Sequence, residues 1–263
     1  MAIVVDGERI EVIDAHTHMG ISPALRIYGC STDRYLAEEG VKTMDAAAVD
    51  QCIAFPCALP QTDYLEANKI IAEQMKRYPK RIIGFLRLNP NYGPQRCVEV
   101  LDYSVEKLGL RGLKLNPFFE FHIPNDEDRM FPIMERLRKH RVPLLYHCGE
   151  VWTASPALIA DLASNFPDVN VIIAHIGIFD YGEDAIALAR RTDNIFLESS
   201  TCVPVFVRKA VKKLGAERIV FGSDSPYTPM GWELDKIAKY SALSIDQLRL
   251  ILAENLKRLL QRV

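Results

Sequence analysis

Residues 12–18 read VIDAHTH, an apolar run that ends in two histidines separated by one residue. The run is short and rich in β-branched and apolar residues, which is typical of a buried β-strand. A doubly wound nucleotide-binding sheet would carry a glycine-rich phosphate turn directly after its first strand. The sequence has His16, Thr17 and His18 there instead, so this segment disfavours the doubly wound fold.

Seven further apolar runs of strand length follow along the chain. Several of them, such as VPLLY and VNVII, are almost continuously apolar, as expected for strands of a parallel sheet that is covered on both faces. With the first run at 12–18, the predicted strands cover residues 51–57, 81–88, 112–116, 143–148, 170–175, 194–199 and 218–224.

Amphipathic patterns of helical period separate these strands. They cover residues 62–78, 94–108, 128–140, 156–166, 183–191, 203–214 and 244–262. Pro94 and Pro156 lie where a proline is tolerated in a first helical turn, and Ser244 and Gln247 have the spacing of a capping box. The strand centres are roughly 30 residues apart, the length of one βα unit. Eight units in about 250 residues are what a closed barrel requires, so we predict an α/β fold with a single (β/α)8 TIM barrel over residues 1–263.

Composition restricts the partners. Lys+Arg 32 against Asp+Glu 34 gives a net charge of −2, which disfavours a nucleic-acid or anionic membrane surface as partner. No window approaches the roughly 20 apolar residues of a membrane span, and the N-terminus lacks the pattern of a signal peptide. Six scattered cysteines without a C-x-x-C pair indicate reduced thiols and a cytoplasmic location.

Four of the six histidines lie at the C-terminal ends of predicted strands: His16, His18, His147 and His175. Strand side chains alternate between two faces, so His16 and His18 point the same way and can chelate one ion. His147, His175 and Asp224 can converge on that ion from other strands at the same end of the barrel. A lone His at a strand end is usually structural, but the joint pattern predicts a site for Zn²⁺ or a similar divalent ion.

Other residues at the strand ends are candidates for binding the substrate. Arg87 ends the third strand and suits a carboxylate, although an ion pair at the barrel rim fits it equally well. Lys114, on the fourth strand, is a second candidate cation, and Trp152 follows the fifth strand. Glu198 ends the seventh strand and is a candidate pocket residue. Tyr28 in the loop after the first strand, and Phe118 and Phe119 after the fourth strand, could enclose a planar or apolar substrate, or simply pack against one another.

The segments VIDAHTHMG, RGLKLNP, VPLLYHCGE, VNVIIAHIG and RIVFGSDSPY resemble those of the amidohydrolase superfamily. Within it they resemble the amidohydrolase family 2 branch, which includes enzymes similar to aminocarboxymuconate-semialdehyde decarboxylase. The resemblance implies that His16, His18, His147 and Asp224 hold one Zn²⁺ per chain with a water molecule, and that His175 lies beside that water. In binuclear members a carboxylated lysine bridges two metals, so the resemblance leaves a binuclear site with Lys114 as the alternative.

The leading expectation is a metal-dependent hydrolase of a small-molecule amide, lactone or ester, with Asp224 and His175 as catalytic residues. A metal-bound water would be its nucleophile. The alternative is a non-oxidative, metal-dependent decarboxylase (a carboxy-lyase) of an unsaturated or aromatic carboxylic acid. A third reading is a barrel that holds metal or ligand without turnover. The resemblance also implies a homodimer.

Overall fold

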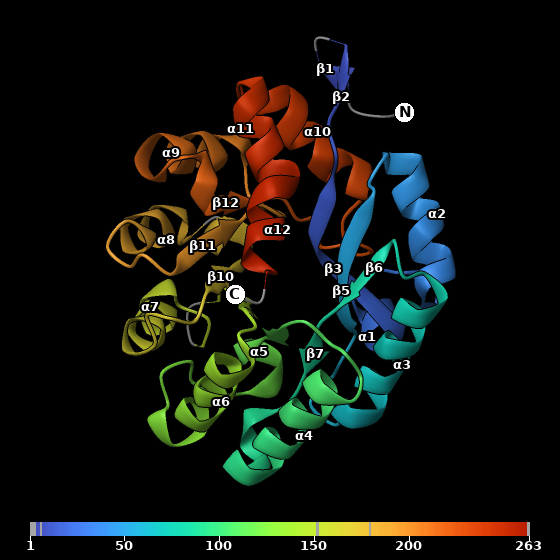
Figure 1. Ribbon diagram of the computed structural model, residues 1–263, viewed down its shortest axis with the longest axis vertical. Helices are drawn as coiled ribbons and strands as arrows, with labels where there is room; N and C mark the ends of the chain where they lie inside the picture. The colour runs from blue at the N-terminus through green and yellow to red at the C-terminus, as the bar shows by residue number, and fades with distance from the viewer. Residues whose placement is uncertain (1–3, 6, 151–152, 179, 262–263) are drawn as a thin grey trace.

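Parallel strands form a barrel with helices around it in the computed structural model, which describes residues 4–5, 7–150, 153–178 and 180–261 (Figure 1). Each of the eight predicted strands is present, and the third is divided in two at Phe85. In chain order the barrel strands are β3 (Ile13–Ile21), β5 (Gln51–Pro56), β6 (Ile82–Gly84) with β7 (Leu86–Arg87), β8 (Leu113–Leu115), β9 (Leu144–Tyr146), β10 (Val171–Ile173), β11 (Ile195–Glu198) and β12 (Ile219–Val220).

Two hydrogen-bonded ladders make up the barrel wall. One runs in the order β12-β11-β10-β9-β8-β7, and the other in the order β4-β3-β5-β6, where β4 (Arg34–Tyr35) is antiparallel to β3. The run 82–87 joins them on one side. On the other side the Ala15 amide donates to the Phe221 carbonyl at 2.9 Å, and the His18 amide donates to the Ser225 carbonyl at 2.7 Å. These bonds close the circle, which confirms the predicted (β/α)8 barrel.

Helices occupy every predicted helical segment. They are α3 (Tyr64–Arg77), α4 (Pro94–Glu106), α6 (Glu127–His140), α7 (Pro156–Asn165), α8 (Gly182–Ala189) and α9 (Pro204–Leu214). The predicted long C-terminal helix is present as α11 (Ile245–Arg249), η4 (Leu250–Glu254) and α12 (Asn255–Leu259), which follow one another without a break, with a π-helical turn at η4. Pro94 and Pro156 lie in first turns, and Ser244 and Gln247 form the capping box. None of the helices in the described part of the chain is both long and apolar enough to span a membrane.

Among the described residues, two helices of more than four residues were not predicted: α2 (Ala37–Ala47) and α10 (Met230–Tyr240). The buried face of α2 consists of Ala37, Gly40 and Met44, of which only Met44 is a large apolar residue. Short elements complete the description: β1 (Val4–Val5), β2 (Glu8–Arg9), α1 (Ala24–Ile27), α5 (Pro117–Glu120), η1 (Pro90–Tyr92), η2 (Ala174–Gly177) and η3 (Ala216–Arg218).

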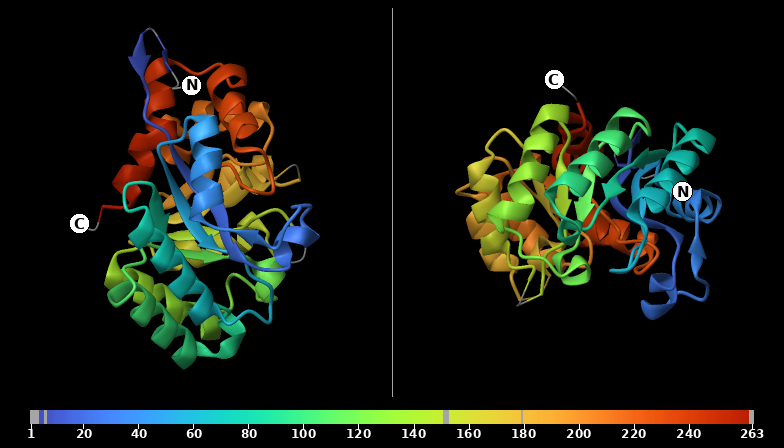
Figure 2. Two further views of the ribbon diagram at one scale, coloured as in Figure 1. Left: turned by 90° about the vertical axis from the view of Figure 1, so that its right-hand side faces the viewer. Right: turned by 90° about the horizontal axis from the view of Figure 1, so that it is seen from below.

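Successive side chains of the barrel strands point alternately into two hydrophobic cores. One face packs under the helices, and the other fills the barrel interior with residues such as Phe55, Ile172 and Val220. Leu256 and Leu259 of the C-terminal helix belong to this interior cluster, so the helix plugs the barrel at the N-terminal ends of the strands. Figure 1 shows α12 across the middle of the ring, and Figure 2 shows the C-terminus and α1 at opposite ends of the barrel. The end at which the strands finish is left for the site.

Leu256, on the C-terminal helix that closes the barrel, is 1% exposed, and its replacement by alanine shortens the buried side chain to a methyl group. We expect the free energy of unfolding, measured by urea denaturation, to fall by about 2–5 kcal/mol because a cavity is left. The control is Ile27→Ala on α1, where the side chain is 64% exposed and the expected change is below about 0.5 kcal/mol. Equal effects of the two substitutions would contradict the plug.

Candidate metal centre

A β-bulge in β3 decides where its two histidines point. The ladder pairs Asp14 with Cys52 but Thr17 with Ala54, so β3 has one residue more than β5 between these pairs. Ile13 and Ala15 face the barrel interior before the bulge, and simple alternation from them would turn His16 toward the helices. After the bulge Met19 packs under the helices, so His16 and His18 face inward. The sequence predicted their shared face correctly but not the bulge that aims it.

The buried carboxylate of Asp14 holds this bulge. Its Oδ1 accepts hydrogen bonds from the backbone amides of His16 and Ser223, both at 2.9 Å. Its Oδ2 accepts from the hydroxyls of Thr17 at 2.9 Å and Ser223 at 2.5 Å. Burial raises the pKa of Asp14 to about 6, against the opposing effect of these hydrogen bonds. Because Ser223 directly precedes Asp224, one side chain fixes the first and last strands relative to each other.

His16, His18 and Asp224 come together at the end of the barrel where the strands finish. The Asp224 Oδ1 lies 3.2 Å from His16 Nε2 and 3.1 Å from His18 Nε2. Each of the three offers one donor atom, and these atoms lie within 4.8 Å of one another, a grouping that could hold a metal ion. Burial lowers the pKa of His18 to about 3. Burial opposes ionisation of Asp224, but hydrogen bonds from His16 and His18 hold its pKa well below the usual range.

His175 and His147 continue the cluster away from Asp224. The His175 Nε2 lies 2.9 Å from His147 Nδ1, and the His175 Nδ1 lies 2.8 Å from the Ser200 hydroxyl. The other ring nitrogen of His147 contacts the Glu150 carboxylate at 2.7 Å. The structure therefore brings His175 beside the three-residue group and gives His147, the predicted fourth ligand, two partners of its own. The sequence analysis missed Glu150, which lies only three residues beyond His147.

The backbone is strained at two of these positions. His175 has a φ of 65° and Asp224 a φ of 59°, both in the left-handed region that side chains other than glycine rarely adopt. Thr201, whose hydroxyl lies 3.0 Å from His175 Nδ1, has a φ of 54°. Strain of this kind costs about 1–3 kcal/mol per residue and concentrates at functional sites.

The two predicted substrate-binding cations occupy different surroundings. Lys114 is buried, with its Nζ 3.4 Å from His16 Nε2 and 5.2 Å from the centre of the Phe55 ring. Burial lowers the pKa of Lys114 to about 7. Arg87 is also buried, but its guanidinium forms an ion pair with Glu120 and donates to the Pro56 carbonyl at 3.1 Å. The charge of Arg87 is therefore already matched by a carboxylate that the sequence analysis did not identify.

Aromatic rings from separate loops line the approach to the cluster. The Tyr227 ring lies 4.6 Å from the His18 ring, and Tyr28 lies 4.9 Å from Tyr227 and 5.4 Å from Phe119, between ring centres. The loops that the sequence analysis named thus meet, with Tyr227 as an additional member. Trp152, the third predicted substrate contact, lies outside the described residues.

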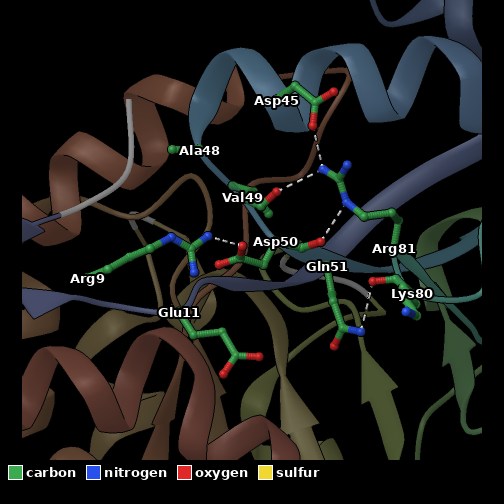
Figure 3. A pocket seen from close by; sticks show the side chains of 9 residues that line it. All are labelled: Arg9, Glu11, Asp45, Ala48, Val49, Asp50, Gln51, Lys80 and Arg81. Atoms are coloured by element: carbon green, nitrogen blue, oxygen red, sulfur yellow. Dashed lines mark hydrogen bonds and ion pairs between the residues drawn. The ribbon is translucent and has the colours of Figure 1, made fainter.

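A hollow of about 560 Å³ lies at the other end of the barrel, where β5 begins (Figure 3). Four of its charged residues form ion pairs with one another. Arg81 contacts Asp45 at 2.8 Å and donates to the Asp50 carbonyl at 2.7 Å, and Arg9 pairs with the Asp50 carboxylate. These contacts stabilise the surface and bring together no histidine ligands, so the candidate centre stays at the opposite end.

Comparison with known proteins shows the family and the fold. The sequence profile of a family described as Amidohydrolase matches residues 13–262. No curated protein sequence matches the chain. Among solved structures, 5-carboxyvanillate decarboxylase from Sphingomonas paucimobilis has a TM-score of 0.74 at 15% identity, covering 95% of this chain and 99% of that one.

Two further solved structures are of similar closeness. Dihydroxybenzoic acid decarboxylase from Polaromonas sp. JS666, with bound manganese and 2-nitroresorcinol, has a TM-score of 0.76 at 18% identity, covering 95% of this chain and 97% of that one. 2,6-Dihydroxybenzoate decarboxylase from Rhizobium has a TM-score of 0.73 at 18% identity, covering 95% and 98%. At these identities the likeness establishes the shared fold.

These findings correct the leading expectation from the sequence. The sequence analysis placed hydrolysis first and decarboxylation second, whereas the solved structures described above are decarboxylases of aromatic acids. The resemblance in metal-ligand motifs could not separate the two reactions, because the same imidazole and carboxylate ligands serve both. The hydrolase prediction is therefore wrong, and the comparisons fit the alternative, decarboxylation, better.

Two substitutions of Asp14 test how far its hydrogen bonds stabilise the fold. Asp14→Ala leaves the amides of His16 and Ser223 without acceptors, at about 1–3 kcal/mol each, so we expect the free energy of unfolding to fall by about 2–6 kcal/mol. Asp14→Asn should cost much less. Its amide oxygen can face both amides, and its NH₂ group can face the hydroxyls of Thr17 and Ser223, which can turn to accept. Urea denaturation of both variants tests this, and equal losses would contradict it.

Proposed function

Because this chain belongs to the amidohydrolase family, we propose that it is a divalent-metal-dependent enzyme that removes carbon dioxide from an aromatic carboxylic acid without oxidation. The observation that carries the proposal is the convergence of His16 Nε2 and His18 Nε2 on the Asp224 carboxylate at the functional end of the barrel. The reaction class comes from the decarboxylases that share the fold.

The donor set fits a divalent ion. Imidazole nitrogen and carboxylate oxygen are the ligands that Zn²⁺ prefers, and the ligand atoms already lie within 4.8 Å of one another. The Nδ1 of His18 is buried and has no hydrogen-bond partner among the described residues. We propose that His16, His18 and Asp224 hold one Zn²⁺ per chain. His147 would become a fourth ligand by giving up its contact with the Glu150 carboxylate. Mn²⁺ is the alternative ion, because one of the solved decarboxylases holds manganese.

The reaction needs one proton and no redox partner. The bond between the ring carbon and the carboxylate breaks, carbon dioxide leaves, and a proton takes its place on the ring. A bound divalent ion supplies positive charge that binds substrate oxygens and stabilises the electron pair left on the ring. Asp224 and His175 are the proposed catalytic residues, since Asp224 Oδ1 lies in the centre and His175 Nε2 can exchange a proton with His147 Nδ1 over 2.9 Å.

We propose that cationic and aromatic side chains around the metal centre bind the substrate. We propose that Lys114 attracts the substrate carboxylate, because its ammonium group is buried beside His16. Arg87 would contribute mainly through its pair with Glu120, which fixes the neighbouring loop, and Trp152 stays a predicted contact. The rings of Tyr28, Tyr227 and Phe119 offer faces on which a planar substrate can stack. The homodimer and the cytoplasmic location also stay predictions.

The direct test is decarboxylation of 2,6-dihydroxybenzoate and 5-carboxyvanillate by protein loaded with Zn²⁺ or Mn²⁺. We expect carbon dioxide and the corresponding phenol to form in equal amounts, measured by gas analysis and chromatography. His16→Ala and Asp224→Asn should lower the rate at least 100-fold, in the range typical of lost acid–base or metal catalysis. Lys42→Ala, on the exposed face of α2, is the control. No turnover of any aromatic acid by the loaded wild type would refute the proposal.

Metal stoichiometry tests the centre separately from the reaction. We expect elemental analysis to find about one ion per chain in the wild type and in Lys114→Ala, because His16, His18 and Asp224 remain. Two ions per wild-type chain, with fewer in the variant, would instead establish the binuclear site with Lys114 as bridge. No retained ion after reconstitution would exclude the proposed centre.

A further inference from the structure

Glu198 lies at the end of β11 behind the metal centre, with no exposed surface. Its Oε2 lies 2.9 Å from His16 Nδ1, 2.9 Å from the Ser200 hydroxyl and 3.3 Å from the backbone amide of His175. Its Oε1 accepts a hydrogen bond from the backbone amide of Ser200. One carboxylate therefore contacts the ring of a proposed ligand and the backbone of a proposed catalytic residue.

All of these neighbours can act as donors, and an ionised carboxylate is an acceptor only. The two backbone amides can do nothing but donate, so each oxygen of Glu198 is committed to accepting. His16 must then carry its proton on Nδ1, where it donates to Glu198. When His16 is a neutral imidazole, its lone pair is then on Nε2 and can face an ion; without an ion, Nε2 can also carry a proton and donate it to the Asp224 carboxylate at 3.2 Å.

Gly222 makes room for this carboxylate. A Cβ atom on residue 222 would overlap Glu198 Oε1 and would lie 2.9 Å from the Cβ of His16. Gly222 does not have a positive φ, so its backbone conformation does not require glycine. The reason for a glycine at this position, just after β12, is the space occupied by the Glu198 side chain.

We propose that Glu198 is the positioning residue of the metal centre, which fixes the tautomer and the ring orientation of His16 so that Nε2 faces the ion. Gly222 is the residue that permits this contact. Carboxylates behind metal-bound histidines commonly act this way, and their loss typically weakens metal binding 10–100-fold. The inference rests on the proposed metal centre, and it assigns to Glu198 no contact with the ion or the substrate.

Glu198→Gln is the informative variant because it keeps the size and changes only the hydrogen-bonding character. Both oxygens of Glu198 face N–H groups, so the NH₂ of a glutamine opposes a donor in either orientation. We expect the dissociation constant for Zn²⁺, measured by competition with a fluorescent chelator, to rise about 10–100-fold. Excess Zn²⁺ should restore most of kcat with KM unchanged, since Glu198 does not touch the substrate.

A spectroscopic measurement separates positioning from a general structural effect. In the metal-free protein with ¹⁵N-labelled histidine, the nitrogen chemical shifts of His16 report which ring nitrogen carries the proton. We expect a proton on Nδ1 in the wild type, with or without one on Nε2, and partial or complete loss of the Nδ1 proton in Glu198→Gln. Wild-type zinc affinity together with an unchanged His16 tautomer in Glu198→Gln would overturn the proposal.

A second variant keeps the carboxylate and displaces it. Gly222→Ala should weaken zinc binding as Glu198→Gln does. Because the added Cβ also crowds the Cβ of His16, the nitrogen shifts of His16 in this variant must show the same loss of the Nδ1 proton, and together the two results decide the question if Glu198→Gln does not fold. Its matched control is Gly231→Ala on α10, where an added Cβ meets no atom within 4 Å. Wild-type zinc affinity in Gly222→Ala would contradict the proposal. His16→Ala tests the proposed metal centre on which this inference rests. If His16→Ala binds Zn²⁺ as tightly as the wild type, the metal centre itself is wrong. If only His16→Ala loses zinc affinity, the centre stands and the role of Glu198 is refuted.

Discussion

The four hydrogen bonds that the Asp14 carboxylate accepts are the interaction on which the site depends. They come from the bulge of β3 on one side and from Ser223, after β12, on the other. The proposed ligands His16 and His18 lie on the first strand and Asp224 follows the last, so this group forms only where these two strands meet. The few backbone hydrogen bonds between β3 and the segment after β12 do not by themselves fix the bulge in β3. Asp14 therefore sets both how these two segments meet and the direction of His16 and His18.

The functional end of the barrel is built at an energetic cost. Asp14, Lys114, Glu198 and the Arg87–Glu120 pair are buried, and each ionic group removed from water needs a partner to offset its desolvation. Left-handed backbone at His175 and Asp224 adds strain. At the opposite end the barrel interior is apolar and is plugged by the C-terminal helix, which supplies stability. This division leaves the strand ends free to hold polar groups in fixed positions.

Much of the fold could be predicted from the sequence, because hydrophobic periodicity and strand spacing are local properties. The eight strands, most helices and the histidines at strand ends all follow from such patterns. The helices α2 and α10 were not predicted. Met44 is the one large apolar residue on the buried face of α2, whereas α10 buries Met230, Leu234 and Ile237 at helical spacing, a signal that could have been found in the sequence. The reaction also could not be read from the ligand motif, because imidazole and carboxylate ligands suit hydrolysis and decarboxylation alike.

The sequence by itself determined that the chain forms a barrel and that His16, His18, His147, His175 and Asp224 lie at its functional end. Only the tertiary structure decided how they are used. It placed Glu198 against His16 across 182 residues of sequence, Glu120 against Arg87, and Glu150 against His147. It also introduced the bulge that turns His16 inward. Alternation along a strand fixes which residues share a face, but hydrogen-bond partners depend on distances between strands, and those distances exist only once the barrel has closed.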